Sequence, residues 1–176
     1  MSLFYTKKFY LRDYERTSKS AQVVIPILID AFGGELSSVI DIGCGRGVWL
    51  EEFAKRGVGA IKGRDGAWVK DANPLIRADE FEATDLSKPY SEAARYDLAM
   101  TLEVAEHIDE VSADVFVDGL TSLSDNIMFS AAIEGQGGQY HVNERPLGYW
   151  IEKFAQRGYK AYDPVRPHVW GDDRVC

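Results

Sequence analysis

The sequence predicts an α/β fold with a doubly wound, mostly parallel β-sheet and helices on both of its faces. Short apolar runs alternate with amphipathic stretches along the chain, which is typical of parallel strands joined by crossover helices. A glycine-rich turn at residues 43–47 joins one such apolar run to one such amphipathic stretch. The length of 176 residues is that of a single domain, so we expect one globular unit.

Composition and charge narrow the function classes. The chain is 45% hydrophobic and 27% charged, as in ordinary globular proteins, which excludes collagen-like and disordered classes. Its formal charge of −8 repels phosphate backbones, so we expect no nucleic-acid partner. No apolar run reaches the roughly 18 residues of a membrane span, and Lys7 and Lys8 are not followed by the apolar stretch of a secretory signal. The two cysteines, Cys44 and Cys176, fit no disulfide or zinc pattern and favour a cytoplasmic location.

The N-terminal part is expected to lie outside the sheet. Residues 4–14 are rich in aromatic side chains and form either a lid or a terminus packed at the sheet edge. A helix is predicted from Ser18 or Ser20 to residue 31, with Pro26 in its first turn or at a kink. We therefore divide the chain into an arm and helix at residues 1–34 and a globular domain at residues 35–176.

The globular domain is predicted to contain six strands. After the first strand, a helix with Trp49 and Phe53 on one face ends at Gly57, and further helices span residues 112–123 and a stretch from Pro146 to Gly158. The predicted strands are residues 38–42, 60–63, 81–84, 96–102, 126–133 and 159–165.

The turn after the first strand predicts a nucleotide site. A strand, a glycine-rich turn and a helix form the first unit of a Rossmann-like fold. A dinucleotide-binding turn needs the pattern G-x-G-x-x-G, but Val48 holds the place of its third glycine. Asp41, at the end of the strand, would repel a diphosphate and attract a cation. S-adenosylmethionine carries a sulfonium and an ammonium and no phosphate, so the charge favours it over NAD.

Several segments resemble one enzyme family. Residues 39–47, VIDIGCGRG, resemble the D-x-G-x-G-x-G motif of class I S-adenosylmethionine-dependent methyltransferases. Residues 84–86 resemble the third-strand motif of that family, and residues 102–108, LEVAEHI, resemble the fourth-strand motif of its small-molecule enzymes. Residues 130–150 are similar to a bacterial subgroup whose substrates are mostly unassigned.

The resemblance implies a role for each residue near the cofactor. Asp41 would hold the amino group, Asp65 the ribose hydroxyls and Asp85 the adenine amine, with Glu103 beside the methionine end. For Asp65 and Asp85 the alternative is an acid that caps a helix or faces solvent. The cofactor-binding set is Asp41, Gly43, Cys44, Gly45, Gly47, Asp65, Gly66, Asp85, Leu86 and Glu103.

Three residues are candidates for the chemical step. Methyl transfer mainly requires alignment, but an oxygen nucleophile also needs a base. We expect His107 or His141 to be that base, because each follows a central strand, and Glu106 to hold the tautomer of His107. Alternatively, His107 only caps a helix.

A metal-assisted variant is a minor hypothesis. Its Mg²⁺ ligands would come from Glu103, Glu106, His107, His141 and Glu144. Their spacing matches no known metal motif, so we expect no metal at the site.

Two features depart from the family pattern. Arg64 stands where the family has an aliphatic residue, so it either indicates a shifted strand register or is a harmless edge residue. The family sheet has a seventh, antiparallel strand, for which this sequence leaves no room after the predicted sixth strand. A missing strand leaves exposed edges, so we expect a homodimer or a disordered C-terminus.

The sequence therefore predicts S-adenosylmethionine-dependent methyl transfer to an oxygen or nitrogen of a small molecule or glycan precursor. The alternatives are a cofactor-binding scaffold without turnover and an NAD(P)-binding oxidoreductase.

Overall fold

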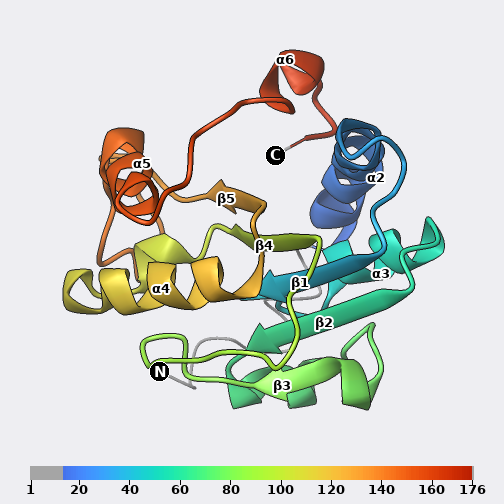
Figure 1. Ribbon diagram of the computed structural model, residues 1–176, viewed down its shortest axis with the longest axis horizontal. Coiled ribbons are helices and arrows are strands. Elements are labelled where there is room, and N and C mark those ends of the chain that lie inside the picture. The colour runs from blue at the N-terminus through green and yellow to red at the C-terminus, as the bar shows by residue number, and fades with distance from the viewer. Residues whose placement is uncertain (1–13, 176) are drawn as a thin grey trace.

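The computed structural model describes residues 14–175, which form one sheet flanked by helices (Figure 1). All strand pairs are parallel, and the strand order is β3-β2-β1-β4-β5. The first five predicted strands are confirmed, with ends shifted by a few residues. The strands are β1 (Ser38–Ile42), β2 (Ala60–Asp65), β3 (Phe81–Ala83), β4 (Leu98–Leu102) and β5 (Ile127–Ser130).

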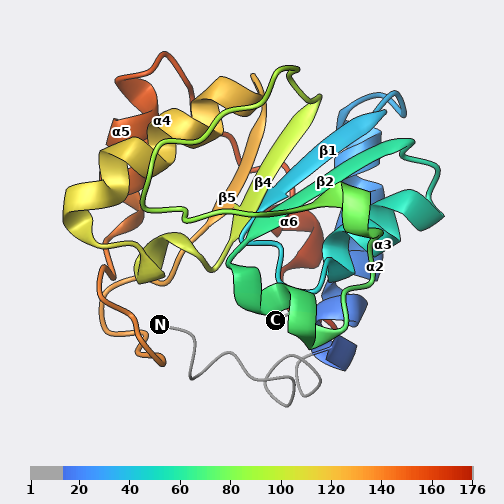
Figure 2. The same cartoon turned by 90° about the horizontal axis from the view of Figure 1, so that it is seen from below.

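Helices cover both faces of the sheet, as predicted. Figures 1 and 2 show α2 (Tyr14–Ala31), α3 (Val48–Lys55) and α6 (Arg166–Val169) on one side. The other side carries α4 (Ala113–Leu123) and α5 (Leu147–Ala155). Short 3₁₀ turns are η1 (Ala67–Ala72), η2 (Ala78–Glu80), η3 (Ala105–His107) and η4 (Glu110–Ser112). Among residues 14–175, no helix has the length and hydrophobicity that crossing a membrane requires.

The strand order indicates where a ligand would bind. The chain runs outward from β1 to β2 and β3, then returns to the other side of β1 for β4 and β5. In open parallel sheets, ligands bind beyond the carboxyl ends of the strands where this reversal occurs. The relevant ends here are those of β1 and β4.

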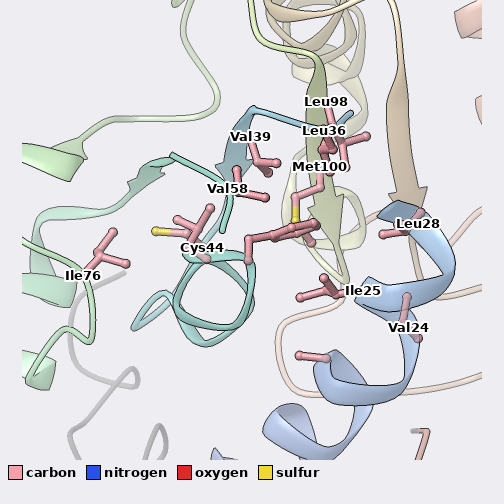
Figure 3. Packing of buried hydrophobic residues seen from close by; sticks show 13 residues of the cluster. Val24, Ile25, Leu28, Leu36, Val39, Cys44, Val58, Ile76, Leu98 and Met100 are labelled. Carbon is pink, nitrogen blue, oxygen red and sulfur yellow. The ribbon is translucent and has the colours of Figure 1, made fainter. Parts of the chain in front are cut away.

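β1 is buried on both faces and separates two cores. Val39 points into the core formed with α2 and α3 (Figure 3), whereas Ile40 and Ile42 point into the core with α4 and α5. Because side chains alternate along a strand, Asp41 faces the same side as Val39. The side chains of α2 in the first core include Val24, Ile25 and Leu28, so this helix completes the core beneath β1.

α2 begins earlier than predicted, and Pro26 lies inside it rather than in its first turn. A proline has no N–H, so it leaves the carbonyl four residues earlier without its helical donor. That carbonyl belongs to Gln22, and Arg56, just after α3, donates a hydrogen bond to it. Arg56, at the C-terminal end of the neighbouring helix α3, thus replaces the N–H donor that Pro26 lacks. The predicted aromatic arm lies almost wholly outside the described residues.

The predicted sixth strand is wrong. Residues 159–165 form no strand, and Figure 1 shows this segment passing from α5 on one side of the sheet to α6 on the other, near β5. A chain that crosses the sheet edge in this way cannot also pair along β5. The hydroxyl of Tyr159 instead lies against the carbonyl oxygens of Thr121 and Ser124, at the C-terminal end of α4.

Neither expectation for Arg64 is correct. Its side chain is only 5% exposed, although β2 keeps a regular parallel register with β1. The guanidinium donates to a carboxylate oxygen of Glu92 at 2.8 and 3.0 Å and to the carbonyl of Ser91 at 3.0 Å. It also lies over the ring of Tyr90. Arg64 therefore fastens the connection between β3 and β4, residues 84–97, onto the sheet.

Candidate active site

The glycine loop takes a backbone shape that only glycine adopts without strain. Gly43, Gly45 and Gly47 have φ values of 83°, 52° and 82°, all in the left-handed region. A Cβ on Gly43 would lie 2.3 Å from a methyl carbon of Val104, and one on Gly47 would lie 2.9 Å from Ile76. Packing within the protein therefore already requires glycine at positions 43 and 47.

Asp65 closes the loop against the end of β2. One of its carboxylate oxygens accepts a hydrogen bond from the Gly45 N–H at 2.8 Å, and the other accepts from the Gly66 N–H at 2.6 Å. The pKa of Asp65 is raised overall, because the effect of burial exceeds the lowering effect of these two N–H donors. Each carboxylate oxygen has a second lone pair, so Asp65 can still accept hydrogen bonds from two hydroxyls.

Asp41 is a buried acid beside the loop. Only 3% of its surface is exposed. Burial and, second, the charge of Asp65 raise the pKa of Asp41 to about 8, so it is neutral at pH 7. A cation placed nearby would favour its ionised form. The residues at this end of β1 therefore fit an ammonium group better than a phosphate.

Asp85, Cys44 and Leu86, which also belong to the predicted cofactor-binding set, differ in how far their side chains are exposed. Asp85 is exposed, and one carboxylate oxygen accepts from both the N–H and the hydroxyl of Ser87. Asp85 therefore caps a turn, which is close to the alternative prediction of a helix cap. The side chains of Cys44 and Leu86 are buried in the two cores, so each can offer a ligand only its backbone. For Leu86 a backbone N–H is the contact that the family resemblance implies.

Glu103 lies where β4 ends, in a strained conformation. Its φ is 55°, which is unusual for a residue with a side chain and is most often retained at functional sites. Its carboxylate accepts a hydrogen bond of 2.7 Å from the hydroxyl of Ser130, the last residue of β5. The next residue, Val104, lies against Gly43, so the turn after β4 touches the glycine loop.

The three predicted catalytic residues meet just beyond this turn. Glu106, His107 and His141 each place one donor atom within 4.8 Å of the other two. The ring centroids of the histidines are 5.0 Å apart, and His141 Nε2 is 3.9 Å from a carboxylate oxygen of Glu106. The segments that supply them are η3 and the loop after β5. Side chains that are distant in the sequence are thus brought together.

Both histidines are held through Nδ1. His107 donates from Nδ1 to the carbonyl of Tyr140 at 3.1 Å, so Glu106 does not hold the tautomer of His107 as predicted. His141 donates from Nδ1 to the carboxylate of Glu144 at 2.8 Å. This hydrogen bond lowers the pKa of Glu144, and burial lowers the pKa of His107. With Nδ1 as the donor in each ring, the uncharged form of the imidazole carries its lone pair on Nε2.

Glu106 is the buried member of the cluster. Its side chain is 1% exposed, and neither carboxylate oxygen has an aligned hydrogen-bond partner among residues 14–175. Burial and, to a lesser extent, the charge of Glu103 raise its pKa to about 7, against the lowering effect of the backbone N–H groups of Glu106 and Ala132. Its backbone carbonyl accepts from the N–H groups of Val142 and Asn143, which ties the loop after β5 to η3.

Sequence reasoning missed three contacts in this region. The sequence analysis offers Glu144 only as a metal ligand, although the run HVNE at residues 141–144 brings this acid close to His141 along the chain. Ser130 was noted only as part of a motif. Nothing in the sequence points to the Tyr140 carbonyl, because its position depends on the left-handed backbone of that residue, with φ of 63°.

Comparison with known proteins identifies the family. The family model described as a methyltransferase domain matches residues 10–116. No curated protein matches this chain.

Solved structures with this fold include magnesium protoporphyrin IX methyltransferase from Synechocystis PCC 6803 with bound SAH. It is 18% identical, with a TM-score of 0.62 and coverage of 88% of this chain and 79% of that one. An O-methyltransferase family protein from Burkholderia thailandensis is 14% identical, with a TM-score of 0.64; the match covers 86% of this chain but 52% of that protein. The plantazolicin methyltransferase BpumL with SAH is 22% identical, with a TM-score of 0.59 and coverage of 85% and 65%. The chain thus belongs to the methyltransferase-domain family, with the Rossmann-like fold of class I S-adenosylmethionine-dependent methyltransferases.

Proposed function

We propose that the chain binds S-adenosylmethionine across the carboxyl ends of β1, β2 and β4 and transfers its methyl group to a small molecule. The observation that carries this proposal is the pair of acids on either side of the glycine loop, the buried Asp41 and the half-buried Asp65. Family membership supports the activity, and similar structures with bound SAH support the cofactor. Within this proposal, the domain at residues 35–176 carries the sites.

The residues at the loop fit the parts of this cofactor. Asp41 would face the amino group, whose positive charge offsets the cost of ionising a buried carboxyl. Asp65 would accept hydrogen bonds from the ribose hydroxyls with its remaining lone pairs. Bound S-adenosylmethionine supplies a methyl group already activated on cationic sulfur. The protein therefore mainly has to hold donor and acceptor in line and exclude water.

The cluster of Glu106, His107 and His141 is where the acceptor would lose its proton. Val104 links the cluster to the glycine loop, because it contacts Gly43 and lies two residues before Glu106. Each imidazole has its hydrogen on Nδ1, so Nε2 can accept a proton from an acceptor hydroxyl or ammonium. Glu144 would stabilise the imidazolium that forms on His141. An oxygen or nitrogen acceptor, including a glycan precursor, fits this chemistry.

Calorimetric titration with S-adenosylhomocysteine tests the proposal. We expect micromolar binding to the native protein and at least a tenfold loss in Asp65→Ala and in Asp41→Asn. Asp30→Ala is the matched control, because Asp30 is an exposed acid on α2. Absence of binding to the native protein would contradict the proposal, and binding of NADH instead would favour the oxidoreductase. Turnover would then be sought by monitoring S-adenosylhomocysteine release across a panel of small acceptors.

A further inference from the structure

The cluster beyond β4 has the arrangement of a metal site. The Nδ1 hydrogens of His107 and His141 are committed to the Tyr140 carbonyl and the Glu144 carboxylate. This leaves Nε2 of each ring available to a ligand. The Nε2 of His141 lies 3.9 Å from a Glu106 oxygen, and one ring nitrogen of His107 lies within 4.8 Å of the donor atoms of the other two residues. Histidine ligands in metalloproteins are oriented in this way by a carbonyl or carboxylate on their second nitrogen.

Glu106 provides an independent indication of a ligand. A carboxylate that is 1% exposed and has no aligned hydrogen bond is costly unless something compensates its charge. Within residues 14–175, the basic side chain at ion-pair distance from Glu106 is His141, whose Nε2 lies 3.9 Å away and whose Nδ1 is engaged with Glu144. The two Glu106 oxygens therefore suit a cation bound between the acid and the imidazoles.

We propose that Glu106, His107 and His141 bind one divalent first-row transition cation, with Zn²⁺ as the reference ion. Two imidazole nitrogens and one carboxylate favour Zn²⁺, Mn²⁺, Fe²⁺ or Co²⁺ over Mg²⁺ and Ca²⁺, which prefer oxygen ligands. Donors around tetrahedral Zn²⁺ lie about 3.3 Å apart. The side chains therefore need to approach one another by roughly 1 Å, which rotation about their side-chain bonds can supply.

The proposal differs from the Mg²⁺ hypothesis in its ligands as well as its ion. The carboxylate of Glu103 receives the Ser130 hydroxyl, and that of Glu144 receives the Nδ1 hydrogen of His141. Both acids thus act outside the donor set. Glu144 orients His141 and keeps its Nε2 free of hydrogen, which is the role of an outer-shell residue.

The role of the cation rests on the proposed methyl transfer. Three protein ligands leave open positions, at which an acceptor oxygen would bind. The cation would lower the pKa of the acceptor hydroxyl, and its proton would pass to solvent water. The oxygen lone pair then forms the bond to the methyl carbon as the carbon–sulfur bond breaks, with that electron pair remaining on sulfur. The cation is unchanged. With the cation bound, the imidazoles serve as ligands, and the base role proposed above belongs to the metal-free site.

Titration of the metal-stripped full chain with Zn²⁺, Co²⁺ and Mg²⁺ tests the site. A Cys176→Ser background removes the terminal thiol as a competing ligand. We expect one equivalent of Zn²⁺ or Co²⁺ to bind at micromolar or lower Kd, with visible Co²⁺ absorption bands and much weaker Mg²⁺ binding. Glu106→Gln and His141→Ala should weaken binding at least 100-fold, and Glu144→Gln about 10- to 100-fold. His168→Ala is the matched control and should bind as the parent does.

Two results would overturn the inference. One is the absence of stoichiometric Zn²⁺ and Co²⁺ binding to the parent protein, which needs no variant to fold. The other is equal binding in the parent, Glu106→Gln and His141→Ala proteins, with circular dichroism showing that all are folded. S-adenosylhomocysteine titration of the same samples separates the two proposals. Cofactor binding without metal binding would contradict only the metal site, and metal binding without cofactor binding would contradict only the proposed function.

Discussion

Asp41→Asn should make the cofactor-free protein more stable at neutral pH. Asparagine has nearly the same shape as aspartate but cannot ionise. Folding raises the pKa of the Asp41 carboxyl from 3.8 to about 8, because the side chain is buried and lies near Asp65. Between these two values, the native state holds a proton that the unfolded chain releases. The contribution of Asp41 to the unfolding free energy is therefore greatest below about pH 4 and falls as the pH rises towards 8.

The size of the effect follows from the pKa difference. Each pH unit between the two pKa values costs about 1.36 kcal/mol of unfolding free energy. At pH 7 the accumulated cost is about 4 kcal/mol, and from pH 5 to pH 7 it grows by roughly 3 kcal/mol. The amide that this substitution introduces packs differently from a carboxyl, but that difference does not change with pH. The change in the stability gap between the two proteins thus isolates the titration of Asp41.

Urea unfolding of both proteins at pH 5, 6, 7 and 8.5 measures this gap, with S-adenosylhomocysteine absent. We expect the unfolding free energy of Asp41→Asn relative to the native protein to rise steadily from pH 5 to 7. It should level off above pH 8, where the native carboxyl also ionises. Asp30→Asn controls for the loss of an exposed acid and should show almost no pH-dependent gap. A gap that stays constant between pH 5 and 7 would refute the raised pKa.

Three further predictions concern the loop, the buried arginine and the cofactor. Gly43→Ala should lower the unfolding free energy by about 2–4 kcal/mol in urea, because Gly43 has a left-handed backbone and a Cβ there would clash with Val104. Gly34→Ala is the control, because Gly34 also has a left-handed φ of 82° but open space around it, and it should cost only about 1 kcal/mol. Equal costs in the two variants would contradict the clash. Arg64→Met should cost about 1–3 kcal/mol, because it leaves Glu92 without its buried partner, and should speed proteolysis within residues 84–97; unchanged proteolysis would contradict the fastening role. S-adenosylhomocysteine binding at pH 7 should release close to one proton, seen as a buffer-dependent calorimetric enthalpy that disappears in Asp41→Asn; a buffer-independent enthalpy in the native protein would rule out an ionised Asp41 in the complex.

The predictions that succeeded depend on local patterns. Alternation of apolar residues, a strand running into three glycines and the stop at Gly57 are set by neighbours along the chain. The predicted sixth strand is wrong, and residues 159–165 also include Lys160, Asp163 and Pro164, which weaken the local strand pattern. Its course was decided by the need to connect α5 and α6 on opposite sides of the sheet.

Local sequence patterns are sufficient to predict the parallel sheet, the glycine loop and the acids at its strand ends, because strand and helix periods and left-handed glycines are local properties. The burial of Arg64 under residues 84–97 and the meeting of Glu106 with His107 and His141 are visible only in the folded chain. Those outcomes depend on how distant segments pack and on a backbone carbonyl at Tyr140, for which no side-chain pattern exists. The acids that the sequence predicts become a site only because the sheet brings the carboxyl ends of its strands to one edge.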